Sequence, residues 1–330
     1  MNTGNTRLMR KINIGILRTI MKQQRIFKKA ELAEASGLSV VTINSLLDEL
    51  IERGEVFETD NLAATGGRRA ALYEYNAGYQ LILTMCLYER NKQEVIHVSI
   101  SNLFGESIFE KESIFAVIRS SELECLIEEC LEKHKTISLI TIGIPGQEIT
   151  GSLQIMDFKG LQGERLSDIL EQEFDIPVLI ENDINVAISG YCLDLDGGDK
   201  SIVGIYYPMN NPPGAGIILN GALLKGKNGM VGEIKYLPFG IEWKHFSFQK
   251  EDVQQHAIKT AIAIGSLYDP DEYVFYGEMF DDDFIREVEK ELSDTFSHIE
   301  VPHIVLETNF HQHYLRGAVA ISLDYLSRQD

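Results

Sequence analysis

The strongest constraint on the fold lies in residues 28–56, which read KKAELAEASGLSVVTINSLLDELIERGEV. Gly37 predicts a left-handed turn between two short helices, and Ser39 predicts an N-cap for the second helix. In that second helix four apolar residues recur at positions i, i+3, i+4 and i+7, which is the spacing of one buried helix face. They are Ile43, Leu46, Leu47 and Leu50. The pattern predicts two helices that cross at a tight turn, as in a helix-turn-helix unit.

Segments on both sides complete this unit. Residues 13–21 predict a preceding helix, because apolar residues recur there at helical spacing. These apolar residues are Ile16, Leu17 and Ile20. After the helices, an expected short strand EVFET leads to TGGRRAALYEYN, where Arg68 and Arg69 follow two glycines and precede an alternating strand. That arrangement is typical of a hairpin wing whose tip reaches phosphates or a minor groove.

The unit predicts DNA binding. Short side chains occupy the exposed face of the last helix near its N-terminus, where a recognition helix contacts base edges in the major groove. The alternative is a helical hairpin that packs against a partner domain or binds a protein. The expected DNA contacts are Lys29, Val40, Val41, Thr42, Asn44, Ser45, Arg68 and Arg69.

Charge is divided unevenly along the chain. The net charge is -20, which by itself disfavours a polyanionic partner. Residues 1–75 nevertheless carry 11 Lys and Arg against 9 Asp and Glu, whereas the remainder carries 19 against 41. The first 30 residues hold eight basic side chains and no acidic one. The balance is compatible with DNA contact at the N-terminal end alone.

Composition predicts a soluble cytoplasmic protein. Its 330 residues exceed the usual size of one domain, so two or three domains are expected. No stretch approaches the roughly 18 uninterrupted apolar residues of a membrane span. The four cysteines, which form no CxxC pair, indicate buried small hydrophobic residues in a reducing compartment. They are Cys86, Cys125, Cys130 and Cys192.

Residues 77–330 predict an α/β fold, because short apolar runs alternate with helical patterns. Expected strands include HVSIS, LITIGIPG, PVLIEND, SIVGIYY, GIILNG and EYVFYGE, and expected helices include residues 121–134, 166–174 and 252–267. The segment LDGGDK suggests a crossing between two lobes near residues 190–200.

Both regions resemble one family. Residues 13–76 resemble the winged-helix head of the ROK family of sugar-responsive repressors and sugar kinases, and the body resembles it in four stretches: IGIPGQ, PVLIENDINVAISG, GAGIILNGALLKGKNGMVGEI and RGAVAISLDYL. The resemblance implies a winged helix-turn-helix domain over residues 1–76. It also implies a duplicated ribonuclease-H-like, actin-type ATPase fold over residues 77–330, with sugar held between the lobes.

The resemblance also suggests where a sugar binds. Asp183 stands at the position of the family's general base, and Asn182 and Glu233 stand at positions that hold other sugar hydroxyls. A structural alternative stays open: Asn182 and Asp183 cap a helix beginning near Ile184, and Glu233 pairs with Lys235 or Lys227.

Features needed for phosphoryl transfer are missing. An Asp-x-Gly-Gly-Thr phosphate turn, expected in LILTMCLYERNKQEVIHVSIS, is absent, and NNPPG replaces the second glycine turn with prolines that lack N–H donors. We therefore expect no enzyme activity, no catalytic role for Asp183 and no cofactor.

No metal site is expected either. Lys235 and Tyr236 replace the family's Gly-His, and no cysteine follows Cys192 to form the family's zinc loop, so the body is shortened there. Three further histidines are expected in a strand and its loop, without a metal. They are His303, His311 and His313.

The sequence therefore predicts a transcriptional regulator, a repressor of carbohydrate-utilisation genes, with a catalytically inactive body that senses a sugar or sugar phosphate. Expected partners are operator DNA, that effector and a second copy in a homodimer or higher homo-oligomer, with no membrane. The alternatives are an ATP-dependent sugar kinase with an appended head and a dimeric regulator that binds no ligand.

Overall fold

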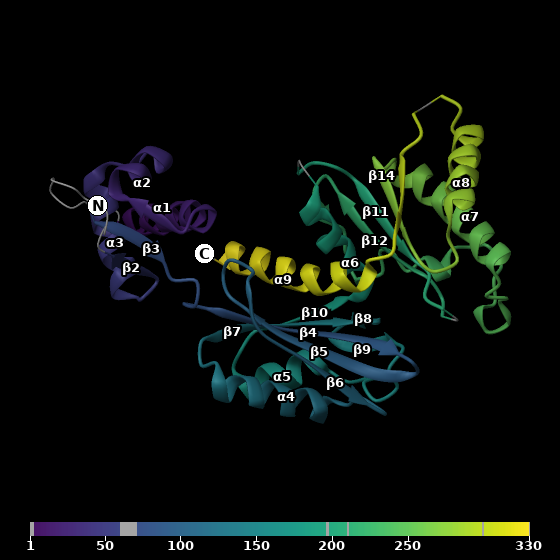
Figure 1. Ribbon diagram of the computed structural model, residues 1–330, viewed down its shortest axis with the longest axis horizontal. Helices are drawn as coiled ribbons and strands as arrows, with labels where there is room; N and C mark the ends of the chain where they lie inside the picture. Colours follow the sequence, from purple (N-terminus) through teal and green to yellow (C-terminus); the bar gives the residue numbers. More distant parts are fainter. Residues whose placement is uncertain (1–2, 60–70, 196–197, 210, 299, 330) are drawn as a thin grey trace.

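A computed structural model describes residues 3–59, 71–195, 198–209, 211–298 and 300–329 of the chain (Figure 1). It shows an N-terminal head beside a body built on two five-stranded sheets and a small β8-β9 sheet, and a long C-terminal helix lies between the two large sheets. None of the described helices combines the length and apolar character needed to cross a bilayer.

The head consists of three helices and a small sheet. The last two helices meet as predicted: Gly37 has a φ of 68°, and the Ser39 hydroxyl accepts a hydrogen bond of 3.1 Å from the Thr42 amide. The sheet is antiparallel in the order β1-β3-β2. The elements are α1 Thr3–Gln23, β1 Ile26–Lys28, α2 Lys29–Ser36, α3 Val40–Glu52, β2 Val56–Thr59 and β3 Leu72–Tyr75.

The buried face of α3 is confirmed, but that of α1 differs from the prediction. Ile14, Leu17 and Met21 face the head core, whereas Ile16 is 38% exposed. The helix also begins at Thr3, about three turns before the expected start. These first turns carry Leu8, Met9 and Ile12, which are 57%, 52% and 47% exposed, so no buried apolar face marks the start of the helix.

The body begins with a sheet in the order β10-β7-β4-β5-β6, of which β6, β5 and β4 are antiparallel and β4, β7 and β10 are parallel. Helices α4 and α5 cover one face. The elements are β4 Leu81–Arg90, β5 Gln93–Ser101, β6 Ser107–Phe115, α4 Ser120–Lys133, β7 Ile137–Ile144, β8 Gly146–Ile149, β9 Ser152–Met156, α5 Leu166–Phe174 and β10 Val178–Asn182.

A second sheet repeats this pattern. Its order is β13-β12-β11-β14-β15, again with three antiparallel strands leading into three parallel ones, and α7 and α8 cover its outer face. The elements are β11 Ile202–Tyr206, β12 Gly214–Leu219, β13 Ala222–Leu223, α7 Lys250–Tyr268, β14 Glu272–Tyr276, α8 Asp282–Thr295 and β15 His303–Glu307.

Two helices lie between the sheets, α6 Asp183–Tyr191 and α9 Phe310–Gln329. They cross so closely that a Cβ on Gly317 would lie 1.8 Å from the Val186 carbonyl oxygen, and one on Gly190 would lie 1.9 Å from the His313 carbonyl oxygen. Both glycines are therefore required by backbone contact. His311 and His313 lie in α9, not in a loop as the sequence suggested, whereas His303 lies in β15 as expected.

The core of the head extends into the body. Leu103, from the β5–β6 turn, is buried among the head's apolar side chains, and Phe104 and Leu326 pack against the same cluster. The Arg25 guanidinium lies 4.8 Å from the centre of the Phe104 ring and pairs with Glu106. The end of α9 thus contacts the head directly.

We predict that Gly317→Ala destabilises the chain by about 1 to 3 kcal/mol or more, because the new methyl group displaces backbone atoms of α6. Gly15→Ala is the matched control: Gly15 lies inside α1 with open space around it, so alanine should stabilise by about 0.5 to 1 kcal/mol. Urea unfolding measures both. A Gly317→Ala chain as stable as the wild type would show that the helices do not cross this closely.

Candidate functional site

The first candidate site is the exposed face of α3. Val40 and Val41 are 51% and 78% exposed, and Ser45 is exposed beside them. Thr42 is half-buried, and its hydroxyl lies 2.9 Å from that of Ser39 in the N-cap. Asn44 is half-buried as well, with a buried Oδ1 that has no hydrogen-bond partner among the described residues. The structure therefore places five of the expected DNA-contacting residues within about one and a half turns of α3.

Lys29 lies apart from that face. It is half-buried at the start of α2, and its ammonium lies 5.1 Å from the centre of the Tyr73 ring, whose hydroxyl raises the pKa of Lys29. The other two basic contacts expected from the sequence, Arg68 and Arg69, lie outside the described residues.

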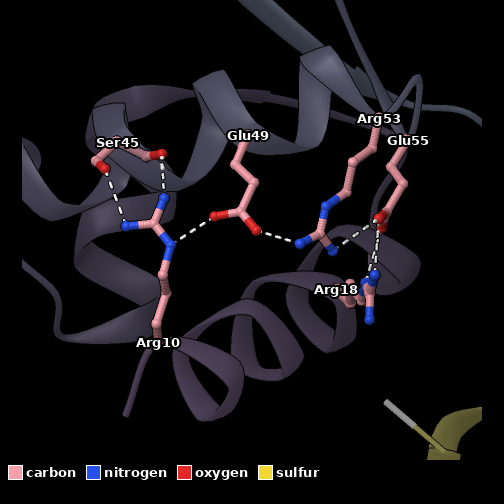
Figure 2. Close-up of polar contacts among 6 residues, drawn as sticks. All are labelled: Arg10, Arg18, Ser45, Glu49, Arg53 and Glu55. Atoms are coloured by element: carbon pink, nitrogen blue, oxygen red, sulfur yellow. Dashed lines mark hydrogen bonds and ion pairs between the residues drawn. The ribbon is translucent and has the colours of Figure 1, made fainter. Parts of the chain in front are cut away.

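Arg10 is a member of this face that the sequence analysis missed. Its guanidinium donates to the Ser45 hydroxyl at 3.3 Å and to the Ser45 carbonyl at 3.2 Å, and it pairs with Glu49 at 2.5 Å (Figure 2). Arg53 pairs with the same Glu49 carboxylate. The only sequence signal was the basic character of the first 30 residues, since the helix that carries Arg10 was expected to begin later.

A buried ion pair anchors the same helix. Arg18 donates to both carboxylate oxygens of Glu55, at 2.8 and 2.7 Å, and Glu55 is fully buried (Figure 2). Removing one partner of such a pair leaves an uncompensated buried charge. The pair therefore fixes α1, and with it Arg10, against the start of β2.

The surface between α1 and α3 is a shallow concavity of about 910 Å³. Its charges are mixed: Arg10 contacts Ser45 and pairs with Glu49, whereas the C-terminal end of α3 carries acidic side chains next to Arg53. Phosphates are attracted by the two arginines and repelled by the carboxylates. The lining residues are Arg10, Val41, Asn44, Ser45, Asp48, Glu49, Glu52 and Arg53.

The second candidate site lies where β10 ends and α6 begins. The Asn182 side chain accepts a 3.2 Å hydrogen bond from the Ile184 amide and donates one of 2.9 Å to the Gly146 carbonyl. The Asp183 carboxylate accepts from the same amide at 2.8 Å. The capping alternative is thus present in the structure for both residues. Asn182 also borders a pocket of about 380 Å³ between β8, α5 and residues 225–229, which Asp183 does not line.

Several carboxyl groups surround Asp183. Burial, together with the nearby charges of Asp157 and Glu233, raises the pKa of Asp183 to about 7, against the opposing hydrogen bond from the Ile184 amide. Desolvation likewise raises the pKa of Asp157, against the opposing effect of Lys235. Glu233 pairs with Lys235 at 3.0 Å, as one sequence alternative proposed. Asp157 is a residue of this site that no motif identified.

The stretch expected to hold a phosphate turn forms a plain hairpin. Arg90 pairs with Gln93, so only Asn91 and Lys92 connect β4 to β5. Both have positive φ angles, 55° and 62°, as a tight two-residue turn requires. Such a turn offers no glycine loop to surround a phosphate.

Aromatic side chains occupy the segment after Tyr236, where the resemblance places a zinc loop. Trp243 donates from its indole nitrogen to the Lys235 carbonyl at 2.8 Å and packs against Phe246 and His256. Burial lowers the pKa of His256 to about 4, so its ring is neutral at pH 7. Packing and one hydrogen bond therefore hold the segment that carries Lys235.

Comparison with known proteins places the chain in a family. Residues 112–242 match the family model described as "ROK family". The chain is 31% identical over 243 residues to the xylose repressor of Caldicellulosiruptor bescii and 24% identical over 243 residues to the DNA-binding transcriptional dual regulator NagC of Escherichia coli strain K12. These alignments cover 70% and 71% of the chain. The chain carries a ROK family domain.

The match to these relatives is partial, because the chain spans 59% of the length of each. Among solved structures, a ROK family transcriptional regulator that is a homologue of the E. coli MLC protein superimposes with a TM-score of 0.69 at 17% identity, covering 97% of both chains. Sugar kinases also share the fold of the body. The similarity of these structures establishes a mixed α/β fold in which the N-terminal helices fit a helix-turn-helix.

We predict that Asp183→Asn stabilises the chain at pH 8 by up to about 4 kcal/mol, the free energy that a rise in pKa from 3.8 to about 7 corresponds to, but not at pH 4. The folded-state pKa of about 7 exceeds the ordinary 3.8, so the folded state binds the proton more tightly. Wild-type stability therefore falls as the pH rises through this window and stays lower above it. Urea unfolding at both pH values measures the difference. An equal effect at pH 4 and pH 8 would contradict a raised pKa.

Proposed function

We propose that the chain is a DNA-binding transcriptional regulator, acting as a sugar-responsive repressor of carbohydrate-utilisation genes. The observation that carries the proposal is the N-capped α3 of the head, which exposes Val41 and Ser45 next to Arg10. Relatives described as repressors of xylose or N-acetylglucosamine systems support it. The finer fold is a winged helix-turn-helix joined to a duplicated ribonuclease-H-like body.

The N-terminal half of α3 is the part of the head that contacts DNA. The N-terminal half of the helix offers short side chains to base edges, and Arg10 is positioned to contact a phosphate. In this arrangement the C-terminal half of α3, which carries Asp48 and Glu52, faces away from the DNA phosphates. Arg68 and Arg69 supply the wing contact. In a homodimer, two heads contact half-sites one or two turns of about 10 base pairs apart.

The body senses a sugar at Asn182, Asp183 and Glu233. These groups donate and accept hydrogen bonds, as recognition of hydroxyls requires. A sugar that favours one angle between the lobes shifts α9, whose far end contacts the head through Leu326. Such coupling requires different affinities for the two lobe arrangements, since a ligand that binds both equally shifts nothing.

A second candidate, an ATP-dependent sugar kinase, is favoured by one observation. A carboxyl group with a pKa of about 7 is suited to accept a proton from a sugar hydroxyl. Phosphoryl transfer also requires groups that position the γ-phosphate and a metal ion. The two-residue β4–β5 turn provides no such group. We therefore favour a role for Asp183 in binding a sugar over a role in catalysis.

For the head, we predict that Arg10→Ala weakens binding to the chain's own upstream DNA and lowers the salt slope by about one, as loss of a phosphate contact does. Glu49→Gln should tighten binding, because it releases Arg10 and removes a negative charge. Arg286→Ala, an exposed change on α8, is the control. Fluorescence anisotropy over a salt series measures all three. Unchanged binding by both head variants would exclude this face.

For the body, we predict that one member of a panel of sugars raises the melting temperature by several degrees. At a ligand concentration of 100 Kd the stabilisation is about 2.7 kcal/mol. Asp183→Asn and Glu233→Ala should lose the shift, and the same samples should show no sugar-dependent ATP turnover. Equal shifts in all three proteins would place the sugar elsewhere, and turnover abolished by Asp183→Asn would establish the kinase.

A further inference from the structure

Two histidines and a glutamate converge where the first sheet meets the start of α9. His97 lies on β5, Glu112 on β6 and His311 in the first turn of α9. One nitrogen or oxygen atom from each lies within 4.8 Å of the others. The rings of His97 and His311 are 6.2 Å apart between centroids. Only the fold brings these residues together, since they are separated by up to 214 positions in the chain.

His97 has an unused ring nitrogen in this cluster. Its side chain is 11% exposed, and its buried Nδ1 has no hydrogen-bond partner among the described residues. The nearest Glu112 oxygen is 3.8 Å away, which is too long for a hydrogen bond. Two ligands of one tetrahedral zinc ion lie roughly 3.4 Å apart, given bonds of about 2.0 to 2.1 Å. The His97–Glu112 separation of 3.8 Å therefore fits a shared ion after a shift of a few tenths of an ångström, and the widest pair in the cluster must close by up to about 1.4 Å.

Glu112 is held in place by two neighbours. Arg90 donates to its Oε2 at 2.7 Å and to its Oε1 at 3.3 Å, and Tyr88 donates to its Oε1 at 2.5 Å. Carboxylates that bind metals are commonly oriented by such outer hydrogen bonds. A carboxylate has about four lone-pair positions, and these three bonds leave one on Oε2. The charge of Arg90 opposes a cation, and the two imidazoles must supply the affinity.

We propose that His97, Glu112 and His311 form a site for a divalent transition-metal ion of the zinc, cobalt or nickel class. Imidazole nitrogens suit these ions, whereas magnesium and calcium prefer sites made of oxygen alone. Glu112 and His311 are exposed, so the ion enters from solvent and water completes its coordination. The ion fastens α9 to the first sheet. The site is distinct from the zinc loop of the family and does not depend on the proposed regulatory function.

The test titrates the full chain, stripped with a chelator, with Zn²⁺ or Co²⁺ alone. We expect one Co²⁺ per chain with visible ligand-field absorption, and a higher melting temperature with Zn²⁺ but not with Mg²⁺. His97→Gln and His311→Gln should each weaken binding roughly 100-fold, because even the loss of an outer partner costs about 10- to 100-fold. Circular dichroism checks the fold of each variant. If His97→Gln is unfolded, the result for His311→Gln, a change at an exposed residue, decides the test.

Two matched variants serve as controls. Glu110→Gln changes an exposed carboxylate two residues earlier on the same strand, and His245→Gln removes an imidazole that is 80% exposed elsewhere in the body. Both should bind the metal like the wild type. The proposal is overturned if wild-type protein shows no stoichiometric Co²⁺ binding. It is equally overturned if His311→Gln binds as tightly as Glu110→Gln.

Discussion

The arrangement of the body depends on the crossing of α6 and α9. Side chains at Gly190 and Gly317 would overlap backbone atoms of the opposite helix, so the two helices approach as closely as polypeptide allows. Each sheet packs against this pair on its inner face, and neither sheet can shift far without displacing a helix of the pair. Packed interfaces of this kind change between discrete arrangements and do not deform continuously. The crossing therefore fixes how the two large sheets sit against each other.

The same pair of helices joins three separate parts of the molecule. The N-terminus of α6 carries Asp183 at the interlobe site, the N-terminus of α9 carries His311, and the C-terminal part of α9 places Leu326 against the head core. Rigid helices are physical connections of the kind that coupling between distant sites requires. Under the proposed function, they are the route by which the body controls the head.

Sequence patterns predicted the elements whose signals are local. Ser39 and Gly37 determined the start of α3 and the turn before it, and alternating apolar runs located most strands of the body. The missed features depend on distant contacts. Arg10 reaches Ser45 only because α1 extends to Thr3 through turns whose apolar side chains are exposed, and Asp157 approaches Asp183 only after the chain folds back. The exposed Ile16 shows a related limit, because three neighbouring apolar positions in α1 fit more than one helical face.

Charge at the interlobe site favours one kind of effector over another. Asp157, Asp183 and Glu233 face a single nearby ammonium, that of Lys235, which is already paired with Glu233. A phosphate placed among these groups is repelled by the carboxylates and meets an ammonium that is already paired, whereas neutral hydroxyls can donate to each carboxylate. A ligand hydroxyl that donates to Asp183 also favours its charged form and lowers its pKa, so binding releases a proton near pH 7. We infer that an uncharged sugar fits this site better than a sugar phosphate does.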